Sequence, residues 1–166
     1  MDETCSWSRE DFAALYRRHI KLVYQICLLM LKNPADAEDA AHTVFRKLME
    51  RQPRLEDPEH QRAWLIVTAR NECRDQLRHW WRSRRAEPEE LGRLAWQPPE
   101  TGGVWEQLAA LPPRERLLLY LYYYQGYSTG EMAQMLGEKP GTLRSHLSRA
   151  RKALKLRLEA EGYGPS

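Results

Sequence analysis

The sequence has no long apolar run and few cysteines. Nowhere in its 166 residues does it approach the roughly 18 consecutive apolar residues of a membrane-spanning helix. The first residues, MDETCSWSRED, are acidic and lack the basic-then-apolar order of a signal peptide. Cys5, Cys27 and Cys73 are odd in number and far apart, which predicts neither a disulfide framework nor a C-x-x-C metal pair. We therefore expect a cytoplasmic protein with reduced thiols and no membrane insertion.

Motifs of catalysis and of metal binding are also missing. There is no P-loop, no nucleophile elbow and no convincing pair of carboxylates outside the first turns of expected helices, where the helix dipole explains the acids. The histidines include no pair with the i, i+4 spacing of a helical zinc site. They are His19, His42, His60, His79 and His146. The sequence therefore predicts a protein that is not an enzyme and that holds no metal or cofactor.

Positive charge is unevenly distributed along the chain. The net charge is only +3, but residues 62–85 hold seven arginines against two acids, and residues 139–157 hold seven basic residues and no acid. Between these stretches, residues 86–103 combine proline, glycine and glutamate. Two basic elements on either side of an acidic, helix-breaking connector suggest two contacts with one polyanion, although each basic run also fits a solvated face.

Helical periodicity runs through nearly the whole chain, with no convincing strand or hairpin pattern. Ser8 with Asp11, Asn33 with Pro34, and Asp57 with Pro58 are helix-start patterns. Residues 117–124 are all apolar or aromatic and fit a buried strand by composition, but the flanking Pro113 and Gly126 favour a helix. We expect an all-α fold of two small helical domains, residues 1–85 and 104–166, joined by a linker at residues 86–103.

The expected helix after Pro58 has two different faces. Its inward stripe comprises Ile66, Ala69, Cys73, Leu77 and Trp80. Its other face carries guanidinium groups and an indole at spacings of three or four residues, from Arg70, Arg74, Arg78, Trp81 and Arg85. Further along, Tyr120, Tyr122, Tyr123 and Tyr124 could stack on bases, but a core or partner-contact role fits them better.

The C-terminal part of the chain has the pattern of a helix-turn-helix. A short helix starts at Ser128 and ends at Gly137, residues 138–140 turn the chain, and a second helix starts at Gly141. In this motif the second helix enters the major groove of DNA, where arginine, serine and threonine contact bases or phosphates. The outward positions are Thr142, Arg144, Ser145, Ser148, Arg149 and Lys152. The alternative is an ordinary helical hairpin with a solvated basic face.

Three stretches in this order carry a family resemblance. They are DAEDAAHTVFRKLME, RAWLIVTARNECRDQL and LPPRERLLLYLYYYQGYSTGEMAQMLGEKPGTLRSHLSRARKAL. With them the chain resembles, over roughly residues 11–158, a bacterial RNA polymerase sigma factor of the extracytoplasmic-function type. The resemblance implies a region 2 helical bundle, a linker and a region 4 helix-turn-helix domain. It also implies a protein that binds core RNA polymerase and directs promoter-specific initiation by recognising the −35 and −10 elements and aiding strand opening.

The resemblance also assigns residues to each contact. The helix at residues 141–159 would read the −35 element through Thr142, Arg144, Ser145, Ser148, Arg149 and Lys152. For the −10 element, Asn71 falls where the family contacts the non-template strand, and the loop at residues 53–60, which includes Leu55, falls where a flipped base is held. Positive charge and stacking surfaces, which hold a single strand, would come from Arg70, Arg74, Arg78 and Trp81.

The remaining implied contacts are with proteins. Docking on the clamp helices of the largest polymerase subunit falls to Asp36, Glu38, Asp39, Val44 and Phe45, and the flap of the second-largest subunit is a second contact. The family commonly works with an anti-sigma factor, and the sequence leaves open whether one holds this protein inactive.

The chain departs from the family pattern at three places. His42 and Thr43 stand where glutamine and glutamate are common, Leu55 stands where an aromatic is common, and Trp80-Trp81 occupies a place that is usually basic. The specificity of the −10 pocket therefore cannot be inherited. Two other classes of protein remain: a stand-alone helix-turn-helix regulator that binds duplex DNA without polymerase, and an interaction protein whose basic helices dock on an acidic partner.

Overall fold

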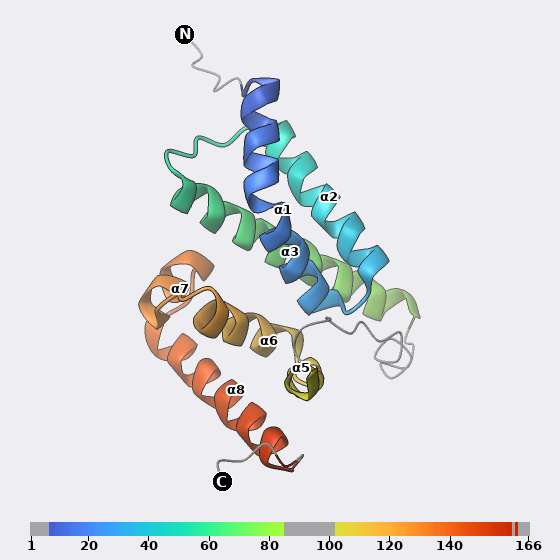
Figure 1. Cartoon of the computed structure of the whole chain (residues 1–166), viewed down its shortest axis with the longest axis vertical. Coiled ribbons are helices and arrows are strands. Elements are labelled where there is room, and N and C mark those ends of the chain that lie inside the picture. The colour runs from blue at the N-terminus through green and yellow to red at the C-terminus, as the bar shows by residue number, and fades with distance from the viewer. Residues whose placement is uncertain (1–6, 85–101, 161, 163–166) are drawn as a thin grey trace. The chain divides into compact units, whose positions relative to one another are not determined.

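The computed structural model describes residues 7–84, 102–160 and 162, and every regular element in these ranges is helical (Figure 1). The chain divides into two compact units, Met1–Ala95 and Trp96–Ser166. The all-α fold expected from the sequence is confirmed. Most of the expected linker lies outside the described residues, so the domain limits stay a prediction. Gly102 and Gly103, which we placed in the linker, instead begin a helix.

The first unit is a bundle of three helices, α1 (Arg9–Leu31), α2 (Pro34–Arg51) and α3 (Pro58–Arg84) (Figure 1). Each helix start predicted from the sequence has its side-chain cap. The Asp11 amide donates to Ser8 Oγ at 3.0 Å, the Asp36 amide to Asn33 Oδ1 at 3.1 Å, and the His60 amide to Asp57 Oδ1 at 2.8 Å. These caps satisfy amides that lack a partner within the helix, so the starts are fixed locally.

Apolar side chains from all three helices fill the centre of this unit. The side chains with no exposed surface include Val23, Ile26, Val44, Leu48, Leu65 and Ile66. The inward stripe predicted for α3 is confirmed at Ile66, Ala69 and Cys73. Its last two members, Leu77 and Trp80, are only half-buried, because they line an open groove with Leu31 and Asp36 rather than the core.

The second unit contains α5 (Gly102–Ala109), α6 (Pro113–Leu119), η1 (Tyr120–Tyr124), α7 (Thr129–Leu136) and α8 (Pro140–Ala160). The stretch at residues 117–124 is helical as predicted, but its second part is a π-helix. In that turn Tyr120 is buried, whereas Tyr123 and Tyr124 are 60% and 68% exposed. Helix α8 begins one residue before the predicted start, because proline is well tolerated at the first helical position.

A buried arginine closes the turn between α5 and α6. Arg116 is 3% exposed, and its Nη1 donates to the carbonyl oxygens of Ala109 at 2.9 Å and Leu111 at 2.8 Å. Burial lowers the pKa of Arg116 to about 10, which leaves the guanidinium charged at neutral pH. The side chain therefore satisfies carbonyls at the end of α5 that the helix itself cannot pair.

Candidate functional site

Helices α7 and α8 form a helix-turn-helix. Ser128 and Glu131 cap α7 reciprocally, since the Glu131 amide donates to Ser128 Oγ and the Ser128 amide donates to Glu131 Oε1, both at 3.1 Å. The helix ends at Gly137, whose φ of 70° lies in the left-handed region that glycine adopts without strain. Leu143, Leu147 and Ala150 are then buried on one side of α8. The short helix, the turn and the second helix predicted from the sequence are therefore present.

The turn of this motif is fastened to α6. Arg114, on the first turn of α6, forms an ion pair with Glu138, whose side chain is only 18% exposed. His146 on α8 lies near both Arg114 and Arg149, and burial together with these two cations lowers its pKa. His146 is therefore neutral at physiological pH. An element outside the helix-turn-helix, α6, is thus tied to the turn that precedes α8.

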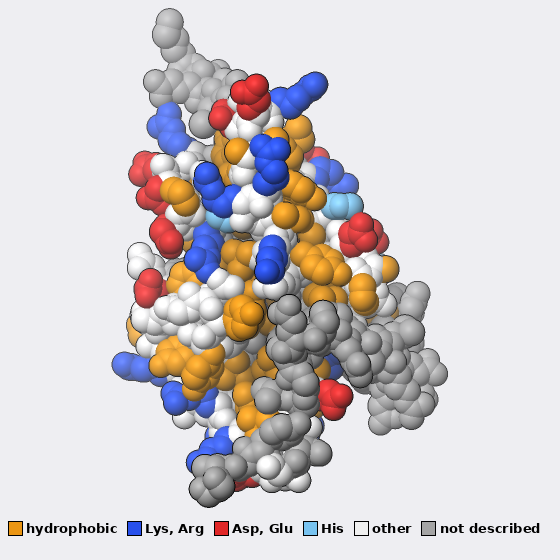
Figure 2. Space-filling view, viewed as in Figure 1, with side chains coloured by type: hydrophobic (Ala, Val, Ile, Leu, Met, Phe, Trp, Pro, Cys, Tyr) orange, Lys and Arg blue, Asp and Glu red, His pale blue; other side chains and the backbone are white. Residues whose placement is uncertain are grey.

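The side of α8 that faces away from its buried residues is polar and basic. All six positions predicted to face outward are exposed: Thr142, Arg144, Ser145, Ser148, Arg149 and Lys152. Figure 2 shows Lys and Arg side chains along this helix. Hydroxyl and guanidinium groups over three successive turns form a surface that can donate hydrogen bonds to base edges and phosphates.

A second polar surface lies on α3 of the first unit. Asn71 and Arg70 are half-buried, and Arg70 Nε donates to Asn71 Oδ1 at 3.2 Å. Because this bond occupies the carbonyl side of the amide, the NH₂ group of Asn71 is oriented away from Arg70. Arg74 and Arg78 are exposed along the same helix. The side chains of Trp81 and Arg85, the remaining predicted members of this face, lie outside the described residues.

A partly buried ion pair between α2 and α3 supports this surface, and no pattern in the sequence predicted it. Lys47 Nζ on α2 donates to Glu72 Oε2 at 2.9 Å, and Gln76 Nε2 donates to Glu72 Oε1 at 3.0 Å. Burial alone would raise the pKa of Glu72, but the hydrogen bonds from Gln76 and Lys47 outweigh it and lower the pKa. Glu72 therefore stays ionised and ties α2 to α3 next to Asn71. The two partners are 25 residues apart, so no local pattern indicates them.

The segment between α2 and α3 is irregular. It follows Gln52, a left-handed residue with φ of 43° that ends α2, and it leads to the cap residue Asp57. Leu55, predicted in the −10 loop, is half-buried in this segment. The segment is therefore anchored at both ends, and it leads directly into the helix that carries Asn71.

The residues predicted to dock on polymerase separate into two groups. Asp36, Glu38 and Asp39 are exposed on the first turns of α2. Val44 and Phe45 are 0% and 3% exposed, and Phe45 packs edge-on against Tyr16 at 4.8 Å between ring centroids. These two side chains cannot touch a partner in this conformation, because their side of α2 faces α1 and α3. The acidic residues alone remain as a contact surface.

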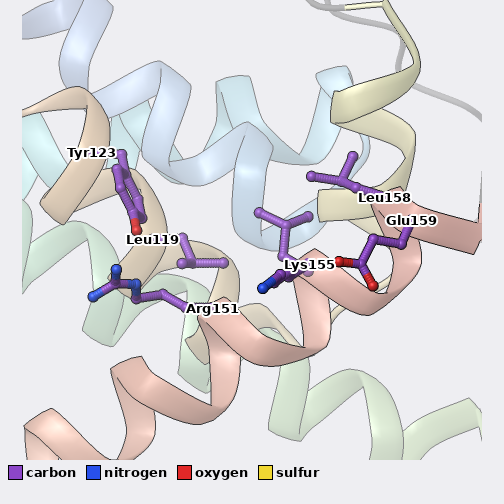
Figure 3. A pocket seen from close by; sticks show the side chains of 7 residues that line it. Leu119, Tyr123, Arg151, Lys155, Leu158 and Glu159 are labelled. Atoms are coloured by element: carbon purple, nitrogen blue, oxygen red, sulfur yellow. The ribbon is translucent and has the colours of Figure 1, made fainter. Parts of the chain in front are cut away.

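A groove in the second unit was also missed in the sequence. It has a volume of about 170 Å³ and lies between η1 and the last turns of α8 (Figure 3). Its lining comprises Leu119, Tyr123, Arg151, Leu154, Lys155, Leu158 and Glu159. The Arg151 guanidinium lies 5.7 Å from the centre of the Tyr123 ring, within the range of a cation–π contact. The groove thus has apolar walls and a mainly basic rim.

In the described ranges, no helix is long and apolar enough to span a membrane. Among those same residues, no three histidine, cysteine or acidic side chains come together in a way that could hold a metal ion.

Comparisons with known proteins match both units. The family model described as sigma-70 region 2 matches residues 15–83, and the one described as sigma-70, region 4 matches residues 102–154. The ECF RNA polymerase sigma factor SigL of Mycobacterium tuberculosis is 28% identical over 158 residues, which cover 90% of this chain and 89% of that protein. The probable RNA polymerase sigma factor RfaY of Xanthomonas campestris is 32% identical over 142 residues, but the chain spans only 36% of its length.

Two solved structures share the fold. The sigma factor RpoE of Bartonella quintana, solved with the anti-sigma factor NepR, superposes with a TM-score of 0.71 at 23% identity, over 90% of this chain and 98% of that one. CnrH, solved with the cytosolic domain of CnrY, gives a TM-score of 0.68 at 25% identity, over 96% and 95% of the two chains.

Proposed function

Since the chain belongs to the sigma-70 family as a sigma factor of the extracytoplasmic-function type, it directs promoter-dependent initiation by RNA polymerase, and we propose which surfaces carry out each step. The observation that carries this division is the presence of two separate polar surfaces, one on α8 and one on α3. A stand-alone helix-turn-helix regulator would need only the first of them. The sigma-70 region 2 match over residues 15–83 favours the sigma factor over that alternative.

The −35 element is assigned to α8. Its exposed residues Arg144 and Arg149 supply bidentate donors for guanine or phosphate, and Ser145 and Ser148 supply hydroxyls between them. The burial of Leu143 and Leu147 on the other side supports this orientation, since the helix can enter the major groove only with its polar side forward.

The −10 element is assigned to the first unit. The outward NH₂ of Asn71 is a donor for a base of the non-template strand, and Arg74 and Arg78 neutralise phosphates along the same helix. A base leaving the duplex loses stacking energy of a few kcal/mol, which the loop at residues 53–60 would return by holding it. Arg70, Leu55 and Trp81 complete this proposed contact.

Core polymerase is assigned to two surfaces. Asp36, Glu38 and Asp39 offer negative charge to the clamp helices of the largest subunit. The groove lined by Leu119, Tyr123 and Leu158 offers an apolar site for the flap of the second-largest subunit. Each surface lies on a different unit, so binding of core polymerase would engage both.

The proposal extends to regulation and location. Two structural relatives were solved with a partner protein, one with the anti-sigma factor NepR and the other with the cytosolic domain of CnrY. We assign an anti-sigma factor to this chain as well, and a cytoplasmic location beside the polymerase that it serves. Members of this family are regulators rather than catalysts, and we assign no reaction to this chain.

The deciding experiment is transcription of genomic DNA by core polymerase with and without this protein, followed by sequencing of the transcripts. We expect new start sites that share −35 and −10 motifs at a fixed spacing. Doubly substituted Glu38→Lys/Asp39→Lys protein should bind core polymerase weakly, whereas Arg149→Ala protein should bind it normally and initiate poorly. Tight, specific binding of a duplex by the chain alone at physiological salt, with no transcript from any promoter, would support the regulator instead.

A further inference from the structure

One side chain at the start of α3 joins this helix to α1. Gln61 Oε1 accepts hydrogen bonds from Arg18 Nη1 at 3.3 Å and from His19 Nε2 at 3.4 Å. Both donors belong to α1, and His19 is only 5% exposed. No motif in the sequence marks Gln61 or Arg18 as a functional residue.

The chemistry of these partners fixes the orientation of the Gln61 amide. Arginine can only donate, so the carbonyl oxygen and not the NH₂ group must face α1. The same oxygen is the acceptor for His19, which therefore donates from Nε2. Burial, with the nearby charges of Arg18 and Arg62, lowers the pKa of His19 and favours its neutral form. The two N–H donors of Gln61 are consequently directed away from α1.

Gln61 lies on the first turn of α3, four residues after Asp57, which ends the irregular part of the segment proposed to hold the flipped base. The backbone N–H of Gln61 donates to the backbone carbonyl of Asp57 at 3.0 Å, and the backbone N–H of His60 donates to Asp57 Oδ1 at 2.8 Å. These bonds fix the end of the loop to the first turn of α3. Within the described part of the chain, the Gln61 NH₂ group has no partner among the hydrogen bonds found, and the side chain is half-buried.

We propose that Gln61 is a further DNA-contact residue of the −10 site, which donates its oriented NH₂ group to an acceptor oxygen or ring nitrogen of a non-template nucleotide. Arg18 and His19 are its positioning residues. The proposal rests on the assignment of the −10 element to this unit.

The Gln61→Glu variant distinguishes a DNA-contact role of Gln61 from a purely structural role between α1 and α3. A carboxylate still accepts hydrogen bonds from Arg18 and His19, and by its charge it strengthens them. It has no donors for DNA. We expect Gln61→Glu protein to keep its melting temperature and its affinity for core polymerase. Its holoenzyme should bind forked DNA with a single-stranded non-template −10 segment about tenfold more weakly. Binding of duplex DNA that ends upstream of the −10 element should not change.

A scan of the DNA strand finds the partner of Gln61 and excludes a general effect of charge. Wild-type and Gln61→Met holoenzymes are compared on forked DNA with an abasic site or a methylphosphonate at each −10 position. At one position the modification should weaken DNA binding by the wild-type holoenzyme, and it should not weaken DNA binding by the Gln61→Met holoenzyme any further. An abasic site with this effect identifies a base as the partner, and a methylphosphonate identifies a phosphate.

The outcomes are distinct from those of the proposed function. If wild-type holoenzyme opens no promoter, the assignment of the −10 element fails. If it opens promoters and Gln61→Glu protein binds forked DNA equally well, or no position loses its effect in Gln61→Met protein, Gln61 is only structural and the inference is overturned. His19→Phe should reproduce the same position-specific loss, and His19→Gln, which can still donate to Gln61, should restore it in part.

Discussion

Glu138, in the turn between α7 and α8, is ion-paired with Arg114 on the first turn of α6. This ion pair joins the helix-turn-helix to α6, which is separated from α7 by η1. Recognition of a major groove depends on the angle between the two helices of the motif and on their support. The ion pair therefore links the stability of the second unit to the position of its DNA-facing helix.

This link is measurable in a double-mutant cycle. Arg114→Ala, Glu138→Ala and the double variant should show a coupling of roughly 1 kcal/mol in the free energy of unfolding, since Arg114 is half-exposed while Glu138 is largely covered. Lys139→Ala, an exposed neighbour in the same turn, is the control and should be neutral. Additive losses in urea titrations of the three variants would mean that the ion pair contributes nothing.

The DNA-facing side of α8 is tested by two arginines of one helix. Arg149→Ala should lower initiation several-fold and reduce the salt dependence of promoter binding by about one phosphate contact, because a guanidinium leaves the DNA surface. Arg157→Ala removes the same charge from an exposed position in the last turn and should change little. Run-off transcription and binding across a salt series measure both. Equal losses of initiation in the two variants would show that the total charge of α8, and not the position of the arginine on the helix, determines promoter binding.

The buried Arg116 should be essential to the second unit. Arg116→Met leaves the carbonyls of Ala109 and Leu111 without a donor, at a cost of roughly 2–3 kcal/mol in the free energy of unfolding. Arg116→Lys should not restore stability, because the lysine ammonium ends one bond closer to the backbone than Nη1, the nitrogen that donates to both oxygens, and is more strongly hydrated than a guanidinium. Chemical denaturation of the full chain measures the loss, and a lysine variant as stable as wild type would contradict this role.

Acidification should weaken the first unit through His19. Its pKa in the folded chain lies below the usual 6.5, so the unfolded chain takes up the proton first. The contribution to stability is complete above pH 6.5 and is lost as the pH falls through the folded pKa. Unfolding free energies measured from pH 8 to pH 5 should therefore decline more steeply for wild type than for His19→Gln. Parallel curves would show that His19 does not titrate differently on folding.

Substitutions of the exposed acidic residues of α2 and of its buried apolar residues should have different effects. Glu38→Lys or Asp39→Lys should weaken binding to core polymerase without changing the melting temperature, since both side chains are exposed. Val44→Ala should lower the melting temperature, because deleting two buried methyl groups costs roughly 1–3 kcal/mol. Calorimetry and a polymerase pull-down measure the two properties. A Val44→Ala protein of normal stability but poor polymerase binding would return Val44 to the contact surface.

Features that depend on neighbours in the sequence were predictable. The caps at Ser8, Asn33 and Asp57 and the helix end at Gly137 all follow from local rules, and the structure has each of them. The six outward residues of α8 are exposed for the same reason. Which bases and phosphates these six residues contact stays a prediction, because helical periodicity indicates which side of a helix is exposed and not what binds to it.

Features that join distant residues were not predictable. Lys47 with Glu72, Arg114 with Glu138, and Gln61 with His19 are separated by 24 or more residues in the sequence, so their pairing appears only in the folded chain. Val44 and Phe45 were assigned to a contact by resemblance, although both belong to the apolar residues that recur every three or four positions along α2. In this case the pattern of the residues predicted burial better than the family did.

The π-helix at Tyr120–Tyr124 decides which side chains this turn displays. A π-turn forms its hydrogen bonds between residues five apart rather than four, so the side chains within it depart from the α-helical periodicity. In this chain Leu117 and Leu118 before the turn and Leu121 within it are buried, whereas the rings of Tyr123 and Tyr124 are exposed. The wider turn thus sets two aromatic rings on the surface of the second unit while its apolar neighbours stay in the core.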